Sequence, residues 1–140
     1  MYTEYCLDID VSIERVIEGV VVKVSALSFL GDVDKETGTI VSYDSGCFGC
    51  SIVNKILVVE KFRGSTVGTY ILYSLCRKGL SPKAILCSEP DPVVVAGAAI
   101  CEIPMVYAIP LDILQLISTG DRITISMKGD KLCISLKKAS

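Results

Sequence analysis

The sequence contains no histidine, so it cannot form a Ser-His-Asp or Cys-His catalytic site or a zinc site that requires imidazole. Its longest apolar run, residues 93–101, is far too short to span a bilayer. No cluster of lysine or arginine stands out, and a net charge of −2 gives no reason to expect nucleic acid. Residues 1–4 lack the basic-then-apolar layout of a signal peptide. We therefore expect a cytoplasmic protein with neither a nucleic-acid nor a membrane partner.

Hydrophobic residues and cysteines are what the sequence does contain. With 140 residues, 51% of them hydrophobic, the chain can bury one sizeable core, and we expect residues 1–140 to form one domain. The seven cysteines are odd in number and follow no export signal, which favours free thiols over a disulfide framework. Four of them lie in apolar stretches and are expected to be small core residues: Cys76, Cys87, Cys101 and Cys133.

The hydrophobic pattern predicts alternating strands and helices. Residues 55–61 form a continuous apolar segment, which is typical of a strand buried on both faces of a sheet. A glycine-rich turn follows, and then a helix that we expect to begin near Ser65 and to end at Gly79. The other expected elements are strands at 19–27, 39–43, 84–87 and 103–109 (an edge strand), a buried helix at 93–101, a helical turn at 111–117, and a hairpin formed by 122–127 and 132–136. This order indicates an α/β layered domain with extra strands at both ends.

The turn after the apolar strand, Arg63-Gly-Ser-Thr66, carries the candidate chemistry. Ligands of α/β folds lie at the carboxyl ends of strands, where the first amides of a following helix offer unpaired donors to an anion. Gly64 allows close backbone approach, and Arg63 adds a positive charge suited to phosphate or carboxylate. Ser65 has an alternative interpretation as the helix N-cap. The turn is not a Walker loop, because the Gly-Lys-Ser/Thr sequence is missing. The residues alone therefore predict an anion-binding turn of unspecified purpose.

Two other patterns are interpreted as structural. Cys47 and Cys50 form a lone C-x-x-C in an expected loop, with neither the second ligand pair of a zinc site nor the helix start typical of a redox motif. Glu89 and Asp91 could form a carboxylate pair, but the prolines between and after them favour turn and cap residues before the next helix.

Several segments, in the same order, resemble the aconitase-X small-subunit, or swivelling-domain, family. They are Leu27-Ser-Phe-Leu-Gly31, Val33-Asp34, Glu36-Thr-Gly38, Arg63-Gly-Ser-Thr-Val-Gly-Thr-Tyr70 and Ala96-Gly-Ala-Ala-Ile100. The resemblance covers about residues 19–125. The Ser-Thr-Val-Gly sequence at residues 65–68 is more similar to the archaeal branch of the family, which dehydrates mevalonate 5-phosphate, than to the branch acting on hydroxyproline. The sequence departs from the family pattern at Asp32, where a second glycine is usual, and at Thr69, where serine is usual. The Cys47–Cys50 segment is not a family motif.

The resemblance implies a swivelling β/β/α-type layered domain that is the small subunit of a heterodimeric [4Fe–4S] hydro-lyase. The implied reaction converts (R)-5-phosphomevalonate to trans-anhydromevalonate 5-phosphate in the archaeal mevalonate pathway. The large subunit would hold the cluster, with none bound by this chain. Ser65 would be the catalytic base that removes the proton beside the carboxylate, and Arg63, Gly64 and Thr66 would bind substrate. The alternatives are a small subunit of a cis-3-hydroxy-L-proline dehydratase and a non-catalytic anion-binding module.

Overall fold

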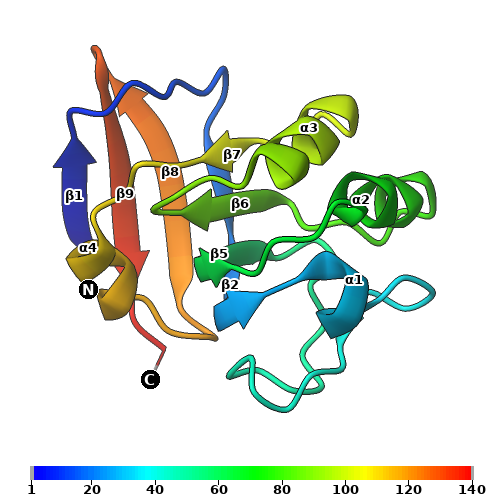
Figure 1. Cartoon of the computed structure of the whole chain (residues 1–140). Coiled ribbons are helices and arrows are strands. Elements are labelled where there is room, and N and C mark those ends of the chain that lie inside the picture. The colour runs from blue at the N-terminus through cyan, green and yellow to red at the C-terminus, as the bar shows by residue number, and fades with distance from the viewer. Residues whose placement is uncertain (1, 140) are drawn as a thin grey trace.

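A sheet of seven strands forms the centre of the molecule (Figure 1). The computed structural model describes residues 2–139, so Met1 and Ser140, the ends of the expected 1–140 domain, lie outside the described part. Across the sheet the strands follow the order β1 (Thr3–Leu7), β9 (Lys131–Lys137), β8 (Arg122–Lys128), β2 (Ile17–Leu27), β5 (Ile56–Phe62), β6 (Ala84–Cys87) and β7 (Met105–Val106). A separate pair consists of β3 (Val33–Asp34) and β4 (Thr39–Ile40).

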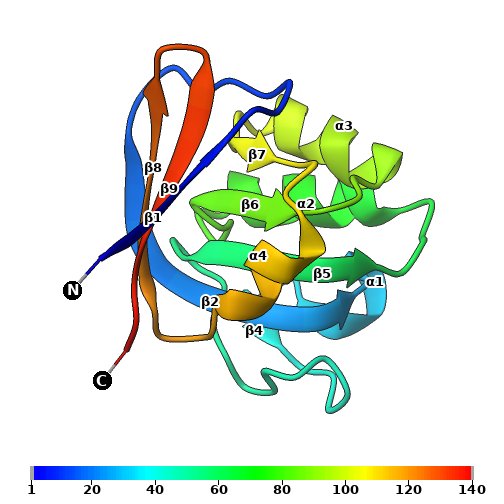
Figure 2. The ribbon, with the colours of Figure 1, turned by 90° about the vertical axis from the view of Figure 1, so that its left-hand side faces the viewer.

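The sheet has two parts that share β2. Strands β1, β9, β8 and β2 are antiparallel, whereas β2, β5, β6 and β7 run parallel. The antiparallel strands turn away from the parallel part, and α4 (Leu111–Leu116) lies between the two (Figure 2). On the other face of the parallel strands lie α1 (Phe29–Asp32), α2 (Gly68–Arg77) and α3 (Pro92–Ile100). This layered arrangement confirms the predicted α/β class.

Each face of the parallel strands has its own hydrophobic core. Ile56 and Val58 contribute to the core beneath α4, whereas Leu57 and Val59 contribute to the core beneath α2 and α3. All four side chains are fully buried, because β5 lies between β2 and β6 and is covered on both faces. The prediction of a buried central strand at 55–61 is therefore confirmed.

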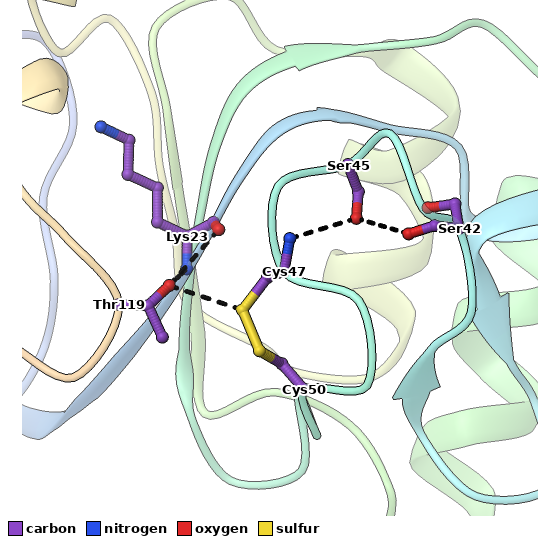
Figure 3. The surroundings of a disulfide bond; sticks show 6 residues. All are labelled: Lys23, Ser42, Ser45, Cys47, Cys50 and Thr119. Atoms are coloured by element: carbon purple, nitrogen blue, oxygen red, sulfur yellow. Dashed lines mark hydrogen bonds between the residues drawn. A yellow bond between two sulfur atoms is a disulfide. The ribbon is translucent and has the colours of Figure 1, made fainter.

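The outer edge of β2 is covered by two segments that are not strands. Strand β8 pairs only with residues 17–20 of β2. Beyond them, the backbone of Lys23 bonds in both directions with the Thr119 hydroxyl, its N–H donating at 2.9 Å and its carbonyl accepting at 3.4 Å (Figure 3). The Ser25 N–H then donates to the Ser45 carbonyl at 2.8 Å. These bonds satisfy backbone groups that an exposed strand edge would leave open to another chain.

Helix α2 starts later than predicted. Its N-cap is Val67, which supplies no side-chain bond, so Ser65 lies two residues before the cap and is not the cap itself. At the other end, Gly79 has a φ of 74°, and the Leu80 N–H donates to the Leu75 carbonyl, which is a Schellman ending. The helix stop was therefore predicted correctly and the start was not.

The expected buried helix at 93–101 is buried on only one side. Asp91 caps α3 by accepting hydrogen bonds from the N–H groups of Val93 and Val94 at 2.9 and 3.2 Å, which confirms the cap interpretation. Gly97 lies against Leu72 of α2, but Ile100 is 59% exposed. Helix α2 and the sheet cover only one face of α3. The apolar composition of residues 93–101 therefore predicted more burial than this helix has.

The expectation of free thiols is wrong for six of the seven cysteines. The disulfides join Cys6 to Cys133, Cys47 to Cys50 and Cys76 to Cys101. The first joins register partners on β1 and β9, and the last joins α2 to the end of α3. Both pairings depend on contacts between distant segments, which the spacing of cysteines does not reveal. Cys87 alone is free and buried, as the core interpretation predicts.

Three smaller differences concern the short strands. The edge strand expected at 103–109 is reduced to β7, because Pro104 and Pro110 lack amide donors and Ala108 adopts a φ of 62°. The strand expected at 39–43 is reduced to β4, and β1 was not predicted. Among residues 2–139, every helix lacks the length and apolar character that a membrane span requires.

Candidate functional site

The carboxyl ends of the parallel strands meet at one edge of the sheet. Strands β2, β5 and β6 are parallel neighbours, so the residues that follow them, Ser28, Arg63 and Ser88, lie along the same edge. The Arg63 N–H donates to the Leu27 carbonyl at 2.8 Å, which ties the start of the predicted site turn to the end of β2. The topology therefore brings the Arg63 turn beside the Ser28–Asp32 segment, as expected for a ligand site of an α/β fold.

The backbone of the predicted site turn is open to a ligand. Within the described chain, no protein acceptor is found for the N–H groups of Gly64, Ser65 and Thr66. The Ser65 hydroxyl accepts a long bond of 3.4 Å from the Val67 N–H and is otherwise available. A methyl group added at Gly64 would meet no atom of residues 2–139 within 4 Å, so packing within this part of the chain does not require glycine there. The turn therefore has backbone donors that an anion could use.

Thr66 and Thr69 have different surroundings. Thr66 is exposed, and no side-chain hydrogen bond is found for it within residues 2–139. Thr69, where the family usually has serine, donates its hydroxyl to the Val93 carbonyl at 2.6 Å. That bond joins the first turn of α2 to the first turn of α3, so the hydroxyl at position 69 has a structural task in this chain.

Arg63 forms ion pairs with two acidic residues, and neither pairing was predicted from the sequence. Its Nη2 lies 3.0 Å from Oδ2 of Asp44, and its Nη1 lies 3.6 Å from Oδ2 of Asp32. Asp32 is buried and also accepts the Ser28 N–H at 2.6 Å, so its carboxylate is held within the Ser28–Asp32 segment. Arg63 is therefore not a free cation in this structure. The departure at position 32 was noted from the sequence, but no local signal links Arg63 with Asp44, which lies 19 residues away.

An open hollow of about 590 Å³ lies at the same edge of the sheet. Its charged lining residues are Glu60, Lys61, Glu89 and Asp91. Glu60 pairs with Lys23 at 3.1 Å, and Asp91 caps α3. With three carboxylates and one amine, the hollow is a poor site for a phosphate. The Arg63 turn is therefore a better binding site for an anionic ligand than the hollow.

The cysteines of the described residues do not fit an iron–sulfur cluster. Cluster iron is held by thiolates, commonly four of them, and six cysteines here are paired in disulfides. Burial raises the pKa of the remaining thiol, Cys87, to about 12, which disfavours the thiolate form. Glu4, Cys6 and Cys133 come within metal-binding distance of one another, but the two sulfurs are already bonded to each other.

Comparison with known proteins establishes the family. The family model described as Aconitase X swivel domain matches residues 7–134. The chain belongs to the aconitase X swivel domain family. This confirms the resemblance seen in the sequence. A solved structure of aconitase X from Thermococcus kodakaraensis, in its holo-form, superimposes with a TM-score of 0.76 at 37% identity, covering 86% of this chain and 90% of that one.

Curated relatives carry a more specific name. A phosphomevalonate dehydratase small subunit of Pyrococcus horikoshii is 49% identical over 112 residues, covering 79% of this chain and 81% of the relative. The subunit of the same name from Pyrococcus abyssi is 46% identical over 114 residues, covering 81% and 85%. The similarity therefore extends over most of both chains and is not confined to one motif.

Proposed function

We propose that this chain is the small subunit of a phosphomevalonate dehydratase, a hydro-lyase that acts only together with a larger subunit. The relatives that bear this name align over most of their length with this chain. The observation that carries the proposal is the Arg63–Thr66 turn, which is placed at the carboxyl edge of the sheet with three backbone donors unpaired. The proposed substrate is (R)-5-phosphomevalonate.

In the proposed reaction Ser65 is the base. Its oxygen takes the proton from the carbon beside the substrate carboxylate, and a new O–H bond replaces the C–H bond. The electron pair of that carbon forms the double bond as hydroxide leaves the neighbouring carbon. The hydroxide then accepts the proton from Ser65, which regenerates the Ser65 alkoxide, so that the products are the alkene and water. A serine hydroxyl is a weak base, so the alkoxide needs nearby positive potential. The free amides of the turn, and Arg63 beside it, are the available sources.

The other proposed roles in this chain are for binding. Arg63 would bind an oxyanion of the substrate, and the backbone at Gly64 and the hydroxyl of Thr66 would line its position. Gly64 suits this role because no atom of the described part of the chain occupies the space beside it. The domain formed by residues 1–140 would swing as one body toward the larger subunit.

We place the iron–sulfur cluster on the larger subunit. Support comes from the cysteines of this chain, which are paired or buried and cannot supply a ligand set. We therefore assign no step of the reaction in this chain to the cluster.

Anaerobic co-expression with the larger subunit tests the proposal. The purified complex should dehydrate mevalonate 5-phosphate and leave cis-3-hydroxy-L-proline unchanged, and the isolated chain should convert neither. Turnover of hydroxyproline alone would assign the chain to the other branch of the family. A complex that turns over neither substrate would leave the turn as a non-catalytic anion site and overturn the proposal.

A further inference from the structure

The two carboxylates that contact Arg63 differ in how firmly they are held. The Asp32 side chain is 8% exposed and is also bonded to the Ser28 N–H, so it remains in place whether or not Arg63 pairs with it. The Asp44 side chain is 71% exposed, and its contact with Arg63 is the only side-chain hydrogen bond or ion pair it forms among residues 2–139. Asp32 therefore anchors the guanidinium, whereas Asp44 occupies its outer side.

The loop that carries Asp44 has a defined shape. The Ser45 carbonyl accepts from both the N–H and the hydroxyl of Ser25, at 2.8 and 3.0 Å. The Cys47–Cys50 disulfide closes the turn that follows Asp44, and the Cys47 sulfur lies 3.5 Å from the Thr119 hydroxyl (Figure 3). Asp44 is thus presented to Arg63 by a pre-formed loop, so the ion pair forms at little cost in chain entropy.

The aromatic residues on either side of this segment support the same shape. The rings of Tyr43 and Phe48 stack with centroids 4.2 Å apart and an interplanar angle of 18°. Tyr43 directly precedes Asp44 in the chain, so the stacking restricts the backbone from which the carboxylate extends.

We propose that Asp44 is a displaceable carboxylate that blocks the anion-binding side of Arg63 until an oxyanion of the substrate replaces it. This inference rests on the proposed function, in which Arg63 binds substrate. A guanidinium binds carboxylate and phosphate through the same pair of donors, so Asp44 and an incoming oxyanion compete for Nη2. Asp32 keeps Arg63 in position while the outer partner is exchanged. Arg63 is 39% exposed, so the exchange needs no opening of the core.

The expected effect follows from the exposure of the pair. Solvent-exposed ion pairs are weak, and their loss changes an equilibrium by up to about fivefold. Replacing Asp44 by asparagine removes the competing charge and should tighten binding of an oxyanion at Arg63 by about two- to fivefold. Replacing Asp32 should weaken it, because the guanidinium loses its anchor.

The chain offers a matched control. Lys78 and Glu36 form an ion pair at 3.0 Å with exposures of 39% and 66%, close to those of Arg63 and Asp44. Glu36→Gln therefore removes one exposed carboxylate of the same kind away from the Arg63 turn. Any effect of net charge alone will appear in this variant as well as in Asp44→Asn.

The test uses the full chain and follows the Arg63 Nε–H resonance by NMR. Inorganic phosphate and acetate are titrated separately at constant ionic strength, which distinguishes phosphate from carboxylate as the competing group. We expect Asp44→Asn to lower the dissociation constant two- to fivefold for at least one anion, with Glu36→Gln equal to the unmodified chain. Equal or weaker binding in Asp44→Asn, or no saturable shift in any variant, overturns the inference.

Kinetics of the complex separate this inference from the function on which it rests. If both hold, Asp44→Asn lowers KM for mevalonate 5-phosphate, and Glu36→Gln does not change it. If the complex does not dehydrate mevalonate 5-phosphate but Asp44→Asn still tightens phosphate binding, the proposed function fails and the competition at Arg63 stands. If turnover is present but the titrations and KM do not respond to Asp44→Asn, only the blocking role is refuted.

Discussion

Replacing Ser65 by alanine separates a catalytic role from a structural one. In this structure the Ser65 hydroxyl forms one hydrogen bond, with the Val67 N–H at 3.4 Å, and does not cap α2. A bond of that length is longer than the usual N–H···O hydrogen bond, so its loss should cost at most about 0.5 kcal/mol of unfolding free energy. A general base, in contrast, is worth about two to four orders of magnitude in rate, or about 2.7 to 5.4 kcal/mol in the barrier. The two roles therefore predict effects of very different size.

Ser51→Ala is the matched control. Its hydroxyl accepts the Val53 N–H at 3.2 Å across the same two-residue spacing, and Ser51 is also half-buried. We expect the two variants to lose similar amounts of stability in urea unfolding. In the reconstituted complex, Ser65→Ala should lose at least a hundredfold in turnover of mevalonate 5-phosphate, and Ser51→Ala should stay near the unmodified rate. A Ser65→Ala complex within a few-fold of that rate would refute the assignment of Ser65 as the base.

Three further predictions concern stability, the turn and the cluster. Burial alone would raise the pKa of Asp121, but its hydrogen bonds, of which the one from Lys138 has the largest effect, outweigh burial and lower the pKa below its usual value. The stabilising contribution of Asp121 is therefore complete at neutral pH and disappears as the pH falls through the lowered pKa. Asp121→Asn should therefore lower stability at pH 7 and flatten its loss below about pH 4 in urea unfolding at several pH values. Gly64→Ala should leave the melting temperature unchanged but reduce turnover. Gly38→Ala should instead lower the melting temperature, because Gly38 has a φ of 73° and the new methyl group would lie only 2.7 Å from Val53 Cγ2. Anaerobic reconstitution of the isolated chain with iron and sulfide should give no brown chromophore, and stoichiometric bound iron and sulfide would contradict the cluster's placement.

Local patterns predicted those parts of the fold that local interactions determine. The strand at 55–61 was found because a strand covered on both faces must be apolar at every position. Gly79 and Asp91 were recognised because a left-handed helix ending and an N-cap each favour a few residue types. The Arg63 turn was placed correctly at the strand end, because strand-turn-helix order is visible in the sequence.

Features that depend on distant segments were missed. The partner of Cys76 is Cys101, on the neighbouring helix, and the partner of Arg63 is Asp44, on a loop that only the folded chain brings near. The start of α2 was misplaced because glycine and serine are common both in a turn before a helix and at its first positions. Intracellular disulfides are unusual outside hyperthermophiles, so composition alone favoured thiols.

The covering of the β2 edge limits which mutations of the covering loop the protein can accept. The segment that closes the strand near Ser25 also carries Asp44 to Arg63, so one loop both covers the edge of β2 and holds the carboxylate that pairs with Arg63. A mutation that frees this loop would uncover the hydrogen-bonding groups of a long apolar strand and invite self-association. We therefore expect substitutions of Asp44, which is exposed, to leave self-association unchanged, and substitutions of Ser45 or Cys47, where the loop contacts β2 and Thr119, to promote it.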